Sequence, residues 1–120
     1  MRVLLPVALA LALSACVGRP FIPEAEWQAG ARAATIDGVD MPGSPLAVPA
    51  ACAAAVGRAR EAGQQIVAVH YRLHRAQRHM LAVAETGTPL SAGAWVELWP
   101  TDCREGQLGR VVPLTGKPQP

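Results

Sequence analysis

The sequence predicts an α+β fold: one short helix followed by a small antiparallel sheet or small β-barrel, after a disordered tether. Three observations support this class. A stretch rich in proline and glycine comes first, an alanine-rich helical pattern follows, and four strand-like segments come after it. Of the 120 residues, 51% are hydrophobic, but 23 of these are alanine. Because so few large side chains remain for a core, the folded part should need a covalent staple.

The first element is a leader. Arg2 precedes an uncharged apolar stretch, Val3–Leu13, which has the length of the apolar region of a secretory signal. Leu13-Ser14-Ala15-Cys16 follows and resembles the lipobox of bacterial lipoproteins. The resemblance implies that residues 1–15 are a signal peptide that is removed, and that Cys16 receives a diacylglyceryl group and further acylation such as palmitate. The alternative is an ordinary secretory signal in which Cys16 is incidental, whereas an uncleaved anchor would be too short to span a membrane.

The residue after the lipobox bears on location. In enterobacteria-like sorting, an Asp after the lipidated cysteine keeps a lipoprotein in the inner membrane. This chain has Val17 at that position. The resemblance therefore implies a protein of the bacterial cell envelope, held in the membrane by its lipid and facing the periplasm from the outer membrane. Two or more acyl chains would make that anchoring stable.

The second element is a linker over residues 16–48, where proline and glycine recur too often for regular structure. A short helix can interrupt it, because Pro23 suits a first helical turn and Glu24 and Glu26 suit a helix N-terminus.

The folded domain is expected over residues 49–115, with a flexible tail over residues 116–120. Pro49 before and Gly63 after an alanine-rich stretch indicate a helix over Ala50–Ala62. Alternation of apolar and polar residues indicates the strands. They are expected over Ile66–Leu73, Met80–Glu85, Trp95–Trp99 and Leu108–Leu114.

Cysteine usage supplies the staple. Once Cys16 is lipidated, Cys52 and Cys103 remain as an even pair in an oxidising compartment, which predicts a disulfide between them. A redox or metal pair is disfavoured, because the chain has no Cys-x-x-Cys and no histidine at ligand spacing from either cysteine.

Three histidines, His70, His74 and His79, occur within ten residues. On a helix, His70 and His74 could share a zinc or copper ion, but on the expected strand they lie about 13 Å apart. No carboxylate is near them in the sequence to orient the rings. We therefore expect no metal site and no cofactor, and a metal site at these histidines stays a weak alternative.

The same stretch also carries Arg72, Arg75 and Arg78 and no acid, at the tip of the first hairpin. Arginine binds phosphate and carboxylate groups, so the tip is a candidate anion-binding surface. The competing interpretation is a solvated hairpin end.

Trp95 and Trp99 share a strand face with Glu97. If Val96 and Leu98 face the core, two indoles flank an acid on the surface, which suits sugar stacking or a protein interface. The competing interpretation is that both faces are covered and that the indoles only fill space.

No catalytic motif is present, so the chain is not expected to be an enzyme. The formal net charge is +2, and +1 without Arg2, which argues against nucleic-acid binding. The leading hypothesis is a non-enzymatic lipoprotein that contacts another envelope component, a protein or peptidoglycan. The alternatives are a periplasmic binder of metal or glycan and an inhibitor of a periplasmic hydrolase.

Overall fold

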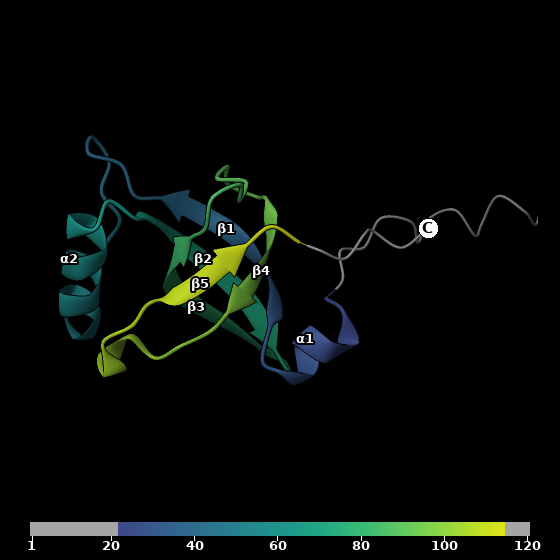
Figure 1. Ribbon diagram of the computed structural model, residues 1–120. Coiled ribbons are helices and arrows are strands. Elements are labelled where there is room, and N and C mark those ends of the chain that lie inside the picture. Colours follow the sequence, from purple (N-terminus) through teal and green to yellow (C-terminus); the bar gives the residue numbers. More distant parts are fainter. Residues whose placement is uncertain (1–21, 115–120) are drawn as a thin grey trace, which may run out of the picture.

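The computed structural model describes residues 22–114 as a five-stranded barrel with a helix on its outside (Figure 1). The strands close in the order β1-β2-β3-β5-β4, and β4 pairs back to β1. In chain order the elements are α1 (Glu24–Gln28), β1 (Arg32–Val39), the 3₁₀ turn η2 (Ala50–Cys52), α2 (Ala53–Glu61), β2 (Gln65–Leu73), β3 (Ala76–Ala84), β4 (Trp95–Trp99), the 3₁₀ turn η3 (Cys103–Glu105) and β5 (Gly109–Val112). The α+β prediction is confirmed, and the sheet is a closed barrel.

The predicted helix forms as η2 and α2. Its Cys52, Val56 and Ala59 recur at helical spacing and are buried. They pack on Ile66 of β2 and Leu81 of β3, which point out of the barrel. The helix therefore covers part of the outer surface of the β2–β3 hairpin, at the end of the barrel away from α1 (Figure 1).

The strands fill the barrel interior by alternation, since successive side chains point to opposite faces. Val96 and Leu98 of β4 face inward. They lie in one cluster with the other buried inward residues: Ala34, Ile36, Val67, Val69, Ala82 and Val111. The small side chains of Ala34 and Ala82 at two of these positions help a barrel of only five strands to close around its own side chains.

Strand β1 corrects the prediction of a linker over residues 16–48. Arg32–Val39 pairs with both β2 and β4 and closes the barrel. Only Ala34 and Ile36 of this strand are fully buried, and Gly38 follows a register shift in its pairing with β2. The sequence did not predict this strand, because its apolar and polar residues alternate only weakly and prolines and glycines surround it. The short helix after Pro23 is present as α1.

The pairing of β5 corrects the expectation of a purely antiparallel sheet. β5 lies antiparallel to β4 and parallel to β3. This circular order, with one parallel pair between the third and fifth strands, is that of the OB-fold, a five-stranded Greek-key barrel. In this chain α2, the longer of the two helices, lies between β1 and β2. Because such barrels serve unrelated functions, the order alone identifies none.

The predicted disulfide is present between Cys52 and Cys103 and links η2 to η3. Among the helices of residues 22–114, none combines the length and the hydropathy that a membrane span requires. The predicted signal peptide, the lipidation of Cys16 and the tail over residues 116–120 lie outside the described residues.

Candidate functional site: a groove along the edge of strand β3

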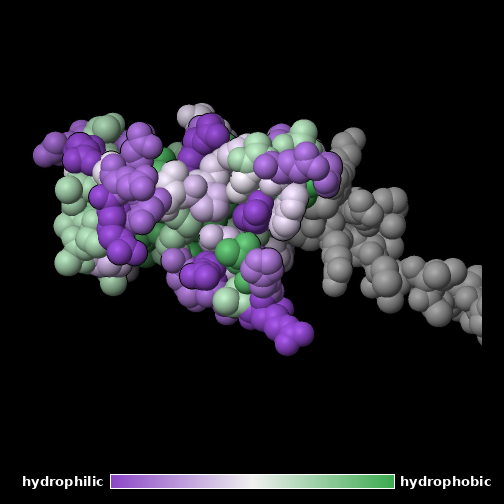
Figure 2. Space-filling model, turned by 90° about the horizontal axis from the view of Figure 1, so that it is seen from below, coloured by the Kyte–Doolittle hydropathy of each residue, from purple (hydrophilic) through white to green (hydrophobic). Residues whose placement is uncertain are grey.

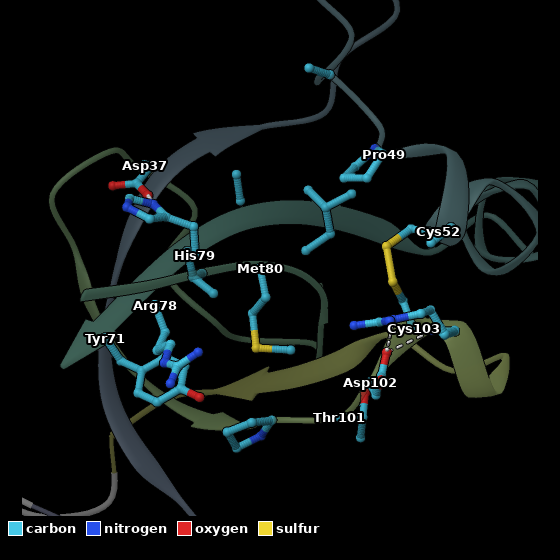
Figure 3. Close-up of a pocket in the computed structure, with 17 residues that line it drawn as sticks. Asp37, Pro49, Cys52, Tyr71, Arg78, His79, Met80, Thr101, Asp102 and Cys103 are labelled. Carbon is cyan, nitrogen blue, oxygen red and sulfur yellow. Dashed lines mark hydrogen bonds and ion pairs between the residues drawn. A yellow bond between two sulfur atoms is a disulfide. The ribbon is translucent and has the colours of Figure 1, made fainter. Parts of the chain in front are cut away.

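A groove of about 900 Å³ runs beside β3 (Figure 3). It exists because β5 is shorter than β3: β5 pairs only with Ala82–Ala84. No strand in residues 22–114 pairs with that side of β3 between Ala76 and Leu81. Arg78–Leu81 form one wall of the groove, and Pro100–Arg104, in the connection from β4 to β5, form the other.

The register of the hairpin shows which backbone groups face the groove. β2 and β3 are joined by the two residues His74 and Arg75, so the flanking pair Leu73–Ala76 exchanges hydrogen bonds. Alternation from that pair directs the amides and carbonyls of residues 77, 79 and 81 away from β2. The amide of Glu85, which has the same parity, donates to the carbonyl of Val111 in β5 at 3.0 Å. Those three residues therefore present strand-type donors and acceptors on the open edge of β3, those of His79 and Leu81 to the groove and those of Gln77 just beyond its end.

The wall opposite β3 is held in place by covalent and hydrogen bonds. The Cys52–Cys103 disulfide fixes η3 against the start of the helix and lies at one end of the groove (Figure 3). Asp102 accepts a hydrogen bond from the amide of Arg104 at 3.0 Å, and the Thr101 hydroxyl donates to the carbonyl of Gln107, also at 3.0 Å. The groove is thus bounded by two elements whose separation the fold fixes.

The surface around the groove mixes apolar and charged side chains. Figure 2 shows green apolar patches between purple hydrophilic residues on the face seen from below. Inside the groove, half-buried Met80 and buried Leu81 stand next to exposed Arg78. An occupant would thus meet apolar Met80 and Leu81 and basic Arg78 on the β3 wall, and the Asp102–Arg104 ion pair on the opposite wall near the disulfide.

The three arginines of the predicted anion-binding tip do not form a single surface. Arg75 occupies the turn, while Arg72 and Arg78 have opposite parity in the hairpin and point to opposite faces. All three are exposed, and only Arg78 lines the groove. Figure 3 shows Arg78 beside Tyr71 at the end of the groove away from the disulfide.

The structure corrects the expectation that the histidines have no carboxylate nearby. Asp37 of β1 lies beside both His70 and His79, which are cross-strand partners. The Asp37 Oδ1–His70 Nδ1 distance is 2.6 Å, and the Asp37 Oδ2–His79 Nδ1 distance is 3.6 Å. His74 stands apart in the turn, with φ at 58°. Sequence reasoning missed this cluster because Asp37 is 33 residues from His70 and belongs to the unpredicted strand β1.

The tryptophans lie outside the groove. Trp95 is 49% exposed, while Trp99 is half-buried with the Arg110 guanidinium 5.4 Å from its ring centre. Glu97 between them is only 2% exposed. The two indoles therefore do not flank a surface acid, because Glu97, which lies between them on the same face of β4, is buried.

Comparisons of the chain with protein-family models, with curated proteins and with solved structures gave no match. The groove along β3 and the cluster of Asp37, His70 and His79 at its end are therefore interpreted from their own geometry.

Proposed function

We propose that this protein is a non-enzymatic lipoprotein of the bacterial envelope, anchored through Cys16, whose barrel binds an extended segment of another envelope protein. The single observation that carries the proposal is the open edge of β3, where residues 76–81 have a strand neighbour on one side only. An extended segment that enters the groove adds a strand to that edge.

Backbone complementarity supports this mode of binding. In strand addition, main-chain hydrogen bonds supply affinity and pockets for alternate side chains supply specificity. Residues 77, 79 and 81 offer their amides and carbonyls on the open edge, and the groove beside Arg78–Leu81 accommodates side chains of the added strand. Soluble proteins usually shield such edges, because unpaired strands invite association. An edge left open along a groove is therefore a suitable docking point.

Charge favours a partner segment with an acidic residue near the hairpin end. Within residues 22–114, Asp102 forms an ion pair with Arg104, whose Nε lies 3.4 Å from the Asp102 Oδ1, and Asp37 is hydrogen-bonded to the ring of His70. Arg78 has no ion pair there, although it lines the groove. An arginine binds a carboxylate through two parallel hydrogen bonds, which would fix the register of the added strand.

The sequence supports the anchoring part of the proposal. Lipidation at the lipobox-like Leu13-Ser14-Ala15-Cys16 would put a lipid before the barrel, and about fifteen residues separate Cys16 from the start of β1. A barrel held near a membrane by such a segment meets envelope partners at a high local concentration.

A photoreactive amino acid in place of Arg78 tests the proposal in cells that make the full-length protein. We expect a cross-link to one envelope protein from this groove position and none from the same amino acid at Glu61, which is exposed on α2. A second substitution, Gln77→Pro, should abolish the cross-link, because it removes an amide from the open edge of β3 and leaves the bonds to β2 intact. Gln77→Ala is the matched control and should keep the cross-link.

Two results would overturn strand addition. One is a cross-link that survives Gln77→Pro, since binding would then not use the edge of β3. The other is equal cross-linking from Glu61, which would indicate random contact at the membrane. Binding of the purified protein to peptidoglycan, with no protein cross-link from Arg78, would assign the module to a polymer instead.

A further inference from the structure

We infer that Asp37, His70 and His79 form a binding site for a divalent ion of a late first-row transition metal, with Zn²⁺ and Cu²⁺ as the best fits. The inference goes beyond the proposed function, because it concerns the outer face of strands β1, β2 and β3 and needs no protein partner. The three side chains offer two imidazole nitrogens and one carboxylate oxygen, all within 4.8 Å of one another.

The distances suit a shared ion. Zinc binds imidazole nitrogen and carboxylate oxygen at 2.0–2.2 Å, so two ligand atoms of a tetrahedral site lie roughly 3.3 Å apart. The two distances from the carboxylate, 2.6 Å to His70 Nδ1 and 3.6 Å to His79 Nδ1, bracket that separation. The ring centres are 5.7 Å apart and the rings are tilted by 42°. The widest separation among the three ligand atoms is up to 4.8 Å, so side-chain movements on the order of 1 Å would bring all three to the spacing of a shared ion.

The backbone holds the ligands in place before any ion binds. His70 and His79 are directly opposite in the hairpin, at a position where β2 and β3 do not exchange hydrogen bonds and side chains come closest. Asp37 falls within the register shift of β1 between Ile36 and Gly38, which turns its side chain outward beside His70. Ligands on three neighbouring strands are more precisely placed than ligands on loops.

The donor set selects the class of ion. Imidazole suits zinc, copper and nickel, whereas magnesium and calcium prefer sites built from oxygen alone. Affinity among these ions rises toward copper, so Cu²⁺ should bind most tightly. Three protein ligands leave at least one coordination position open, and the side chains of His79 and Asp37 are 66% and 38% exposed. Water, or a ligand from another molecule, can complete the site.

One basic side chain, Arg72, lies near the site, and the Asp37 carboxylate offsets its charge. Arg72 follows His70 by two residues on the same face of β2, about 7 Å away along the strand. Its charge opposes cation binding, and the Asp37 carboxylate in direct contact with the ion outweighs it at that separation. Arg78 points to the other face of the hairpin.

The test uses the full-length protein in detergent and Zn²⁺ alone, in competition with a chromophoric zinc chelator. We expect one ion per chain and a loss of affinity of about tenfold or more for His79→Ala, for His70→Ala and for Asp37→Asn. His74→Asn is the matched control, because it removes an imidazole from the same hairpin and keeps a residue that tolerates positive φ. This control should bind zinc as the unchanged protein does.

A second measurement needs no variant. Substoichiometric Cu²⁺ should broaden the imidazole proton resonances of His70 and His79 and leave those of His74 sharp. The inference is overturned if His74→Asn loses as much affinity as His79→Ala, if all three imidazoles broaden together, or if zinc does not bind. These outcomes do not depend on a partner protein, so they stand apart from the test of strand addition.

Discussion

One carboxylate, Asp40, connects the end of β1 to the helix and to β2. Its side chain accepts hydrogen bonds from the Arg60 guanidinium, at 2.9 and 3.0 Å, and from the amide of Leu46 at 3.0 Å. Its carbonyl accepts a further bond from the side chain of Gln65 at 2.7 Å. The Arg60 hydrogen bonds, followed by that of the Leu46 amide, lower the pKa of Asp40 below its usual value. The ionised Asp40 carboxylate, which the folded state stabilises, thus holds the loop after β1 in place.

This contact predicts a pH-dependent effect of Asp40→Asn. Because the pKa is lower in the folded chain, the ionised Asp40 stabilises the fold above its unfolded pKa of about 3.9. That contribution is lost as the pH falls through the folded pKa. We expect the variant to melt several degrees below the unchanged protein at neutral pH, and the difference to vanish in acid. Thermal unfolding followed by circular dichroism across this range measures it, and a constant difference would contradict it.

Cys16 carries the second prediction at this scale. If the lipobox resemblance holds, labelled palmitate enters the unchanged protein and not the Cys16→Ser variant, because only the cysteine sulfur can form the thioether. Membrane fractionation provides the parallel measurement: the unchanged protein should sediment with membranes. Equal labelling of both proteins would contradict lipidation at this position.

At the scale of elements, the sequence predicted those segments whose pattern is local. Regular alternation marks β2 and β4, and the alanine-rich stretch between Pro49 and Gly63 marks α2. Strand β1 was not predicted, because it buries only two residues and pairs with strands more than 25 residues away in the sequence. The candidate groove escaped for a related reason: it arises from the difference in length between β3 and β5, and the register of a parallel pair leaves no local pattern.

Two glycines allow a matched comparison between elements. A methyl group on Gly109 would lie 3.0 Å from Met80 Cε and 3.3 Å from the carbonyl of Trp99, where β5 enters between β3 and β4. Gly109→Ala should therefore destabilise the fold by about 1–3 kcal/mol. Gly57 in α2 is exposed and has open space around it, so Gly57→Ala should stabilise by about 0.5–1 kcal/mol.

Urea unfolding of the two variants and the unchanged protein measures both effects. The opposite signs are the useful feature, because a general sensitivity to alanine substitution would move both midpoints the same way. If Gly109→Ala proved neutral, the close approach of β5 to Met80 and Trp99 would be wrong.

At the scale of the whole molecule, the disulfide links elements 51 residues apart. In the chain-entropy model, closing a loop of this length stabilises the fold by roughly 4 kcal/mol. We expect the Cys52→Ala/Cys103→Ala double variant to lose about that amount in urea unfolding. Reductant should lower the midpoint of the unchanged protein and have no effect on the double variant. Equal midpoints for the two oxidised proteins would show that the bond adds no stability.

The same bond has a topological consequence. It makes a covalent ring that contains β2, β3 and β4, yet neither β2 nor β3 pairs with β4. The ring alone is therefore a hairpin and a lone strand with two gaps between them. β1 fills one gap and β5 fills the other. In the sequence, β1 precedes Cys52 and β5 follows Cys103, so both strands lie outside the ring. The barrel can close only when the chain as far as Val112, the end of β5, takes part in the sheet. The disulfide can therefore form before the barrel closes, but the disulfide alone does not close the barrel.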